Sequence, residues 1–487
     1  MNILLASTAL LVPVILIYWL DRRSRSKLAR IPGPPSHPFF GHSFLVPKIK
    51  LWKYFEELAH QYGRIVKLNV GQDIIILSHP SDAEELARKY GSNNLRLSML
   101  PYGENLKRQR AAFHQMLQPR VIGGYEEMQH TESLRLMVDL VEAPNRFYHH
   151  FQRFPASLVF TLSYGQRLND DGRDLADVTE VFTQFVRDIG PGAHLVDAFP
   201  VLDRLPDFLS PCANLILSLA PVLKALNGSR WRSEAQRKHQ RELEVYGRLA
   251  LDVKAQMEKD PEMECFAARL WDQQEKLNLT DEELFYIAGS AFAAGTDTNT
   301  LTLLWFVMAM ALYPATMKKA QQEIDSVFNS DSLPNFSRMK DLPYCFALVK
   351  EVFRWGPAAP LSIPHYTDAD DEYKGYTIHK GTTVISSIWN MHHNEEEFPD
   401  SYTFNPERFL SKGSVSGDGA ESLTEGHYGF GFGRRKCPGL HLAAKSTWLA
   451  IVRVLWAFNI EPRKDASGNI MEIDPDSCTP GLTSYVF

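Results

Sequence analysis

One long helical pattern in the second half of the chain is the feature that most limits how the chain can fold. Thr280-x-x-Glu283 has the form of a capping box, in which a hydroxyl and a carboxylate bind the first free N–H groups of a helix. The apolar stretch that follows, 284–312, would be about 45 Å long at roughly 1.5 Å per residue. A helix of that length can cross a whole domain.

The composition supports one large packed body around such a helix. The 487 residues are 44% hydrophobic and 23% charged, an ordinary globular balance that excludes a disordered chain. Length alone suggests about three domains, but no Gly/Ser-rich linker, repeat or charge block marks a boundary, so we expect one. The net charge of −6 argues against a general nucleic-acid binder. The five scattered cysteines contain no CxxC pair, which argues against a disulfide framework or a zinc site and suits a reducing compartment.

The N-terminus has the pattern of a membrane anchor. The uncharged run 3–20 is just long enough to span the hydrocarbon core as a helix, and basic residues follow at 22–27. A cleaved signal peptide, the alternative, would carry its basic residues before the apolar run. The positive-inside rule then leaves the body of the protein in the cytosol. We expect a transmembrane anchor at 1–20 and a basic, proline-rich joint at 21–36.

The remaining patterns predict a mainly α protein with a small β portion. Apolar residues at helical spacing predict a helix over 51–62, and alternation around Gly71 predicts a hairpin with strands at 66–70 and 73–77. Ser81-x-x-Glu84 predicts the capped start of a short helix. Further predictions are a mostly helical region over 104–350, a strand-rich patch over 371–389, and a last helix from just after Cys437 to about Phe458.

A glycine-rich basic loop around Cys437 has the chemistry of a thiolate metal ligand. Cations at 434–436 and the start of a helix near Gly439 both favour the ionised sulfur. The glycines at 431, 433 and 439 allow a close approach of the backbone to a broad, flat group. The alternative for a lone cysteine is a buried structural residue.

The loop resembles the heme-binding loop of the cytochrome P-450 superfamily, the heme-thiolate monooxygenases. The matching pattern F-x-x-G-x-R-x-C-x-G is formed by Phe430, Gly433, Arg435, Cys437 and Gly439, and it would occur by chance at roughly one in 10⁷ starting points. The resemblance implies the fold of that superfamily, a single heme-enclosing catalytic domain over 37–487. It also implies that Cys437 is the axial ligand of the iron of heme b and that Arg435 contacts a propionate.

The middle of the long helix carries the sequence AGTDT at 294–298. Gly295 costs about 1 kcal/mol of helix propensity, which suggests that something bulky lies close to the backbone there. Asp297 and Thr298 could relay protons through water, whereas the alternative for Thr298 is a hydroxyl bonded back to the preceding turn. The resemblance implies an acid–alcohol pair that delivers protons during oxygen activation, with Ala294 and Gly295 beside the heme.

Two further motifs support the resemblance. Glu351 and Arg354 lie three residues apart, on one helix face, and match the family's ExxR motif. With Arg408 of the PERF segment they form an implied structural triad. The helix around Arg110 resembles the family's WxxxR segment but has Leu106 in place of the tryptophan, so one donor to a heme propionate is missing. His365 lies where another propionate partner is expected.

The resemblance predicts a monooxygenase that inserts one atom of O2 into an apolar or aromatic small molecule. Electrons would come from an NADPH–cytochrome P-450 reductase in the endoplasmic reticulum membrane, with the catalytic domain facing the cytosol. Substrate contacts are expected from 93–102, 182–209 and 359–363. Local sequence details resemble fungal members of secondary metabolism, which suggests a polyketide, terpenoid or alkaloid substrate. A basic docking face would comprise Arg108, Arg434, Lys436 and Lys445, although a solvated charged face explains them equally well.

Two other functions stay open at this point. One is a heme-thiolate isomerase or dehydratase that needs no O2, against which the intact Asp297 and Thr298 argue. The other is a non-catalytic, membrane-anchored binding protein, whose motifs would be expected to show damage that this sequence does not have.

Overall fold

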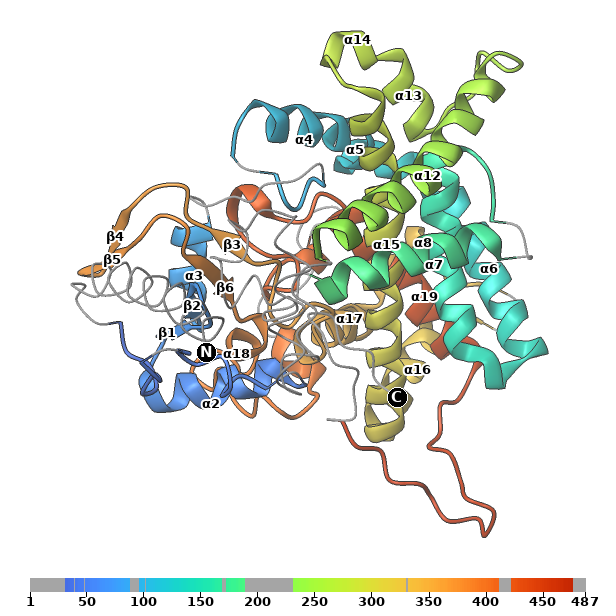
Figure 1. Cartoon of the computed structure of the whole chain (residues 1–487). Coiled ribbons are helices and arrows are strands. Elements are labelled where there is room, and N and C mark those ends of the chain that lie inside the picture. The colour runs from blue at the N-terminus through green and yellow to red at the C-terminus, as the bar shows by residue number, and fades with distance from the viewer. Residues whose placement is uncertain are drawn as a thin grey trace.

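A computed structural model describes residues 31–38, 40–47, 49–87, 96–100, 102–168, 172–188, 231–329, 332–410 and 422–475. The chain is mainly helical with small sheets, as expected. Most helices gather on one side of the molecule and the strands on the other (Figure 1). The predicted anchor at 1–20, most of the joint at 21–36 and the tail at 481–487 lie outside the described residues.

The described part contains a four-stranded sheet and a separate two-stranded ladder. The larger sheet has the order β1-β2-β6-β3, and its strands are β1 (Ile65–Asn69), β2 (Asp73–Leu77), β6 (Thr383–Ser386) and β3 (His365–Tyr366). The predicted hairpin is confirmed, because β1 and β2 pair antiparallel with Ile65 opposite Leu77. The strand β6 then pairs parallel to β2 and antiparallel to β3. The ladder joins β4 (Asp371–Tyr373) to β5 (Tyr376–Ile378), within the predicted strand-rich patch.

The helices follow the predicted order. Their bounds are α2 (Leu51–Tyr62), α3 (Pro80–Ala87), α4 (Glu104–Leu117), α5 (Pro119–Ile122), α6 (Glu126–Glu142), α7 (Phe147–Tyr164), α8 (Arg173–Asp188), α12 (Trp231–Met257), α13 (Phe266–Asp272), α14 (Gln274–Leu277), α15 (Asp281–Leu312), α16 (Pro314–Val327), α17 (Pro343–Trp355), α18 (Ile388–His392) and α19 (Leu440–Ala457), with short 3₁₀ turns at Phe336–Asp341, Pro406–Phe409 and Gly433–Arg435. The prediction that Ser81 caps a helix is wrong. The helix α3 begins one residue earlier, at Pro80, because proline suits the first helical turn.

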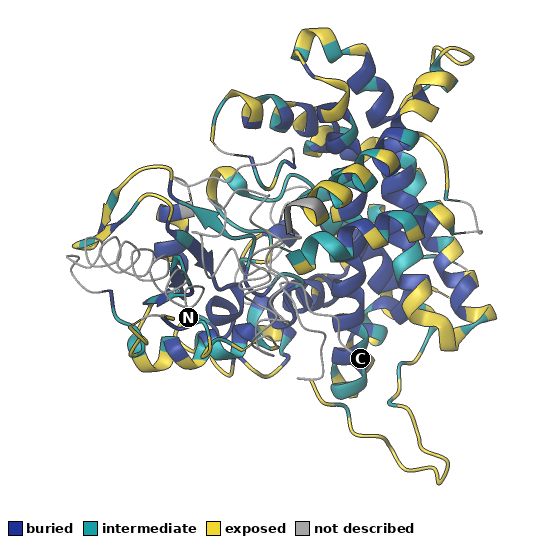
Figure 2. Cartoon of the chain, viewed as in Figure 1, coloured by how far each residue is buried: buried dark blue, intermediate teal, exposed yellow. Residues whose placement is uncertain are grey.

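The helix α15 is the long helix that the sequence predicts, and its capping box is confirmed. Glu283 N–H donates to Thr280 Oγ1 at 3.1 Å, and Thr280 N–H donates to Glu283 Oε2 at 3.0 Å. Most of α15 is buried, and it lies against α7 in the middle of the helical side (Figure 2). Within the described ranges no single helix has the length and hydropathy of a membrane span. Together α15 and α16 do, but they meet at 106°.

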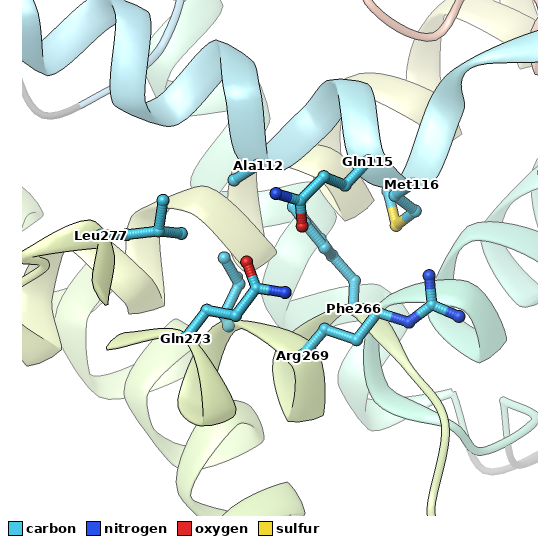
Figure 3. A pocket seen from close by; sticks show the side chains of 8 residues that line it. Ala112, Gln115, Met116, Phe266, Arg269, Gln273 and Leu277 are labelled. Atoms are coloured by element: carbon cyan, nitrogen blue, oxygen red, sulfur yellow. The ribbon is translucent and has the colours of Figure 1, made fainter. Parts of the chain in front are cut away.

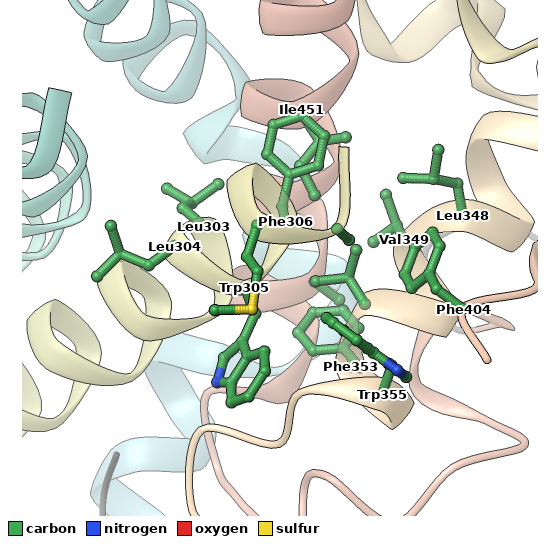
Figure 4. Close-up of a cluster of buried hydrophobic side chains, with 14 of the residues drawn as sticks. Leu303, Leu304, Trp305, Phe306, Leu348, Val349, Phe353, Trp355, Phe404 and Ile451 are labelled. Atoms are coloured by element: carbon green, nitrogen blue, oxygen red, sulfur yellow. The ribbon is translucent and has the colours of Figure 1, made fainter. Parts of the chain in front are cut away.

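The largest hydrophobic core lies where the second half of α15 meets α17 and α19 (Figure 4). Phe306 of α15, Val349 of α17 and Ile451 of α19 are all fully buried in it. Trp305 and Trp355 pack edge to face with their ring centroids 5.4 Å apart. This core holds α15 together with α17, which carries the ExxR motif, and with α19, which follows the cysteine loop.

Candidate active site

The loop from Phe430 to Gly439 is closed by its own backbone. Cys437 N–H donates to Phe430 O at 2.9 Å, and Gly431 N–H donates to Tyr428 O at 2.9 Å. Gly431 and Gly433 have φ angles of 73° and 53°, which side-chain-bearing residues rarely adopt. The helix α19 then starts at Leu440, so the predicted helix start directly after the cysteine is confirmed.

Cys437 is a half-buried residue at the end of this loop. Burial raises the pKa of its thiol, while the N–H of Gly439 and the charges of Arg110 and Lys436 lower it by less. Desolvation therefore outweighs the nearby cations at this sulfur, although the cations act in the expected direction. A bound metal ion would supply the missing positive charge.

Two arginines meet beside the cysteine. Arg110 Nη2 donates to Lys436 O at 3.1 Å, and Arg435 donates from Nη1 to Leu97 O at 3.3 Å and from Nη2 to Leu100 O. Burial and the charge of Arg110 lower the pKa of Arg435 to about 10. In the part of the chain that the structure describes, neither guanidinium has a carboxylate within ion-pair distance. Two half-buried cations without a counter-charge fit the carboxylates of heme propionates.

The AGTDT stretch divides between two sides of α15. Ala294 is exposed, and Thr298, one turn later on the same face, is half-exposed; Asp297 is buried, with 3% of its surface accessible. Thr298 Oγ1 donates to Ala294 O at 2.8 Å, which is the back-bonded geometry given above as the alternative for this hydroxyl. A hydroxyl in that geometry still keeps lone pairs that accept a hydrogen bond.

The glycine of this stretch has a different neighbour from the one expected. A side chain on Gly295 would reach within 2.8 Å of Val159 Cγ2 on α7. The packing of α7 against α15 therefore explains Gly295, and close approach to a cofactor is not required. On another side of α15, Thr447 Oγ1 of α19 lies 3.2 Å from Asn299 Oδ1, which ties the middle of α15 to the helix that follows Cys437.

The ExxR and PERF residues form one buried cluster. Arg354 donates to both oxygens of Glu351 at 2.7 Å, and Arg408 Nε donates to Glu351 Oε1 at 3.1 Å. The side chains of Glu351 and Arg354 are 0% exposed. Arg354 Nη1 also donates to His392 O at 2.7 Å, and His392 Nε2 accepts from Tyr428 N–H at 2.8 Å. The cluster is thereby linked through α18 to the segment directly before the cysteine loop.

The other predicted contacts have mixed outcomes. His365 is half-buried in β3, opposite Val384 of β6, and its role toward a propionate stays a prediction. Arg108 does not belong to a free docking face, because it bonds to Leu277 O at 2.9 Å and to Glu283 at 3.1 Å. Lys445 is likewise paired, with Glu126 at 2.6 Å.

Among the described residues, hollows also lie outside the cysteine loop. A cavity of about 10 Å³, large enough for roughly one water molecule, separates α4 from α13 and α14, with Gln115 and Gln273 on its opposite walls (Figure 3). A larger one of about 340 Å³ lies between α5, the turn Phe336–Asp341 and the start of α19, and is lined in part by His441 and Lys445.

Sequence reasoning missed the partners of Arg435 and a group of buried histidines. The carbonyls of Leu97 and Leu100 have no residue-type signal, so no pattern could have found them. The stretch NMHHN at 390–394 could have drawn attention to two of them: His392 packs against His427 with the ring centroids 6.2 Å apart, and His393 stacks on Trp389 at 3.9 Å.

The buried histidines predict a loss of stability in mild acid. Burial lowers the pKa of His427 to about 4 and that of His393 to about 3, from roughly 6.5 in an unfolded chain. The unfolded state then binds more protons below about pH 6.5, so the stability present above that pH is lost as the pH falls. Between about pH 7.5 and about pH 5.5 the two residues together should lower the free energy of unfolding by about 3 kcal/mol.

Urea unfolding at the two pH values would measure this loss. His427→Asn should remove only part of the pH dependence, since His393 and His392, whose pKa values are also lowered by burial, still titrate. Equal urea midpoints at both pH values would contradict the prediction.

Comparison with known proteins identifies the family. The model described as "Cytochrome P450" matches residues 31–480. A cytochrome P450 monooxygenase of Armillaria gallica is 30% identical and covers 96% of this chain and 90% of its own length. Cytochrome P450 monooxygenases fogE of Aspergillus ruber and drtD of Aspergillus calidoustus are 31% and 32% identical, covering 94% and 95% of this chain and 86% and 84% of their own lengths. These relatives are fungal, in agreement with the sequence resemblance.

The cysteine loop, the paired arginines and the buried ExxR cluster occupy one connected region, and the family match extends across all of it. The chain therefore belongs to the cytochrome P450 family and is a heme-dependent monooxygenase.

Proposed function

We propose that the protein inserts one oxygen atom of O2 into an apolar or aromatic small molecule of fungal secondary metabolism, of the polyketide, terpenoid or alkaloid class. The observation that carries the heme-thiolate part of the proposal is the meeting of Arg110 and Arg435 beside Cys437 without a carboxylate partner among the described residues. The fungal origin of the relatives and the local sequence resemblance support the substrate class.

The residues that would hold heme b come from four parts of the chain. Cys437 would bind the iron through its sulfur, and Arg110 and Arg435 would neutralise the propionates, with His365 as a further candidate. Phe430, Gly433 and Gly439 would shape the loop on one side of the heme site. The exposed face of α15 at Ala294, beside Gly295, would form the opposite wall of that site. When bound, heme with a cysteine thiolate ligand supplies the activation of dioxygen, because the thiolate favours cleavage of the O–O bond.

Asp297 and Thr298 would manage protons in this site. The hydroxyl of Thr298 donates to Ala294 O and can accept a hydrogen bond from water on its half-exposed side. Asp297 lies buried one residue earlier, where its carboxyl group could resupply that hydroxyl through water. The pair would thus hold and pass protons between the buried side of α15 and its half-exposed face.

Substitution of the pair should slow turnover strongly. Thr298→Ala and Asp297→Asn are each expected to lower the rate of product formation by about 10²-fold, within the usual range for lost proton transfer. Thr300→Ala is the matched control, because its hydroxyl makes the same back-bond, to Thr296 O at 2.8 Å, on a buried side of α15. Equal rates for Thr298→Ala and Thr300→Ala would contradict the role.

Electrons would come from a membrane-bound NADPH–cytochrome P450 reductase at the endoplasmic reticulum. The uncharged run 3–20 followed by basic residues at 22–27 supports a single-pass anchor with the catalytic domain in the cytosol. Fractionation of cells that express the full chain tests this part, since a soluble product would overturn the anchor.

The absorption spectrum of the reduced protein under carbon monoxide tests the heme-thiolate assignment. A red-shifted Soret band is expected, and its absence would overturn the assignment. Product analysis in a host that lacks the gene would then identify the substrate, and labelled dioxygen would show whether one oxygen atom enters the product. A reaction that proceeds without NADPH and O2 would instead support the isomerase or dehydratase alternative.

A further inference from the structure

Arg96 has a buried charged side chain that the proposed mechanism does not use. Only 4% of its surface is exposed. Its Nη2 lies 2.6 Å from Glu242 Oε1 of α12, and its guanidinium lies over the ring of Phe185 of α8, 4.2 Å from the ring centroid. Arg96 therefore contacts two helices that follow it far along the sequence.

The carboxylate that receives Arg96 is itself held in place. Tyr286 of α15 donates from its hydroxyl to Glu242 Oε2 at 2.6 Å, and His239 Nδ1 lies 2.6 Å from that hydroxyl oxygen. Burial alone would lower the pKa of Arg96, but Tyr246 and Glu242 outweigh it, so that the pKa is raised and the guanidinium stays charged. The pair is thus a fixed, charged contact between residue 96 and the helices α8, α12 and α15.

The backbone at Arg96 forms the turn that reaches the cysteine loop. Met99 N–H and Leu100 N–H donate to Arg96 O at 2.8 and 3.1 Å. Two carbonyls of the same turn, at Leu97 and Leu100, accept hydrogen bonds from Arg435, two residues before Cys437. A continuous series of contacts therefore runs from Glu242 through Arg96 and its turn to Arg435.

We propose that Arg96 is a positioning residue that fixes the turn 96–100 against α8, α12 and α15 and thereby aims Arg435 at its propionate. The proposal rests on the heme-thiolate function given above. The turn also lies within 93–102, the segment expected to border the substrate, so the same contact limits how far the turn can move aside. Loosening of the turn in an Arg96 variant is therefore expected to ease the entry of bulky molecules as well as to misplace Arg435.

Amide hydrogen exchange in the full chain tests the contact without relying on activity. Arg96→Gln should raise exchange at Met99 and Leu100 by at least about tenfold, while amides of the α15 core near Phe306 stay unchanged. Glu242→Gln keeps a group that accepts from Tyr286 but loses the charge, and it should give the same local increase. The double variant should add little to either single change, because both remove the same interaction.

Arg248→Gln is the matched control for a general loosening of the helices. Arg248 of α12 pairs with Asp174 of α8 at 2.6 Å, across the same two helices, and its ion pairs within the described chain go to Asp174 and Asp177 rather than to the turn 96–100. Amide hydrogen exchange at Met99 and Leu100 in Arg248→Gln should equal that of the wild type. An equal increase in Arg248→Gln, or no increase in Arg96→Gln, would overturn the proposal.

Two iron ligands of different size test the effect on entry in the heme-loaded protein. The association rate of 4-phenylimidazole should rise several-fold in Arg96→Gln, whereas that of the smaller imidazole should stay within about twofold of the wild type. If the ratio of the two association rates were the same in Arg96→Gln and in the wild type, the role in entry would be overturned. If the wild type did not show the carbon monoxide band, the proposed function would be wrong. The hydrogen-exchange experiment would still decide whether Arg96 holds the turn.

Discussion

Glu351→Gln is expected to lower the free energy of unfolding by about 3 to 5 kcal/mol, the usual cost of leaving buried charges unpaired. Glu351 is the only carboxylate that the described residues place against both Arg354 and Arg408. It also accepts from Asn405 N–H at 2.9 Å, so its loss disturbs the backbone of the segment that leads into the PERF turn. Urea unfolding of the full chain, together with the yield of soluble protein, measures the effect.

Glu407→Gln is the matched control in the same PERF segment. Glu407 pairs with Lys319, but the two side chains are 50% and 51% exposed, and such surface pairs contribute less than about 1 kcal/mol. Glu351→Gln and Glu407→Gln each remove one negative charge and change the side chain in the same way. If both variants unfolded at the same urea concentration, the buried cluster would not have the structural role proposed for it.

Cys437→Ala is expected to abolish the red-shifted carbon monoxide band and to lower turnover by well over about 100-fold. Loss of a residue that only orients a metal ligand already lowers activity by up to about 100-fold, and loss of the ligand itself should lower it further. The loop itself should keep its shape, since the backbone bond from residue 437 to Phe430 O does not involve the sulfur. The spectrum, the heme content and the product rate are the three measurements.

Cys265→Ala is the control for Cys437→Ala, because it removes a buried cysteine that is not the proposed iron ligand. Cys265 is buried at the start of α13, where its sulfur accepts from Ala268 N–H at 3.4 Å. Its loss should cost about 1 kcal/mol of stability, as for a helix cap, and leave band and turnover intact. Persistence of the band in Cys437→Ala would remove Cys437 as the ligand.

The features that the sequence predicted well are those decided by residues close together along the chain. The capping box of α15 needs only Thr280 and Glu283, and the hairpin of β1 and β2 needs only alternation on either side of Gly71. The side chains of Glu351 and Arg354 meet because residues three apart share one face of a helix. Family resemblance supplied the long-range partner Arg408, which no spacing rule could have provided.

The features that the sequence could not predict depend on what packs from elsewhere. Gly295 indicates that the helix needs space on one side, but not that α7 fills it. Arg108 has the positive charge expected of a docking residue, and only the position of Glu283 in the structure shows that this charge is already paired. The pKa of Cys437 is a balance between burial and nearby cations, and the sequence shows the cations alone.

The parallel pairing of β2 with β6 has a consequence for how the chain folds during synthesis. Leu77 pairs with Ser386, so the outer edge of the early hairpin has no partner until roughly 300 further residues have been made. At typical ribosome speeds this takes roughly 15 to 60 s. Throughout that time the row of isoleucines in β2 presents an unpaired strand edge, the kind of surface that binds other unfolded chains. Protection of that edge by a chaperone would then help to set the yield of folded protein, in addition to the stability of the finished core.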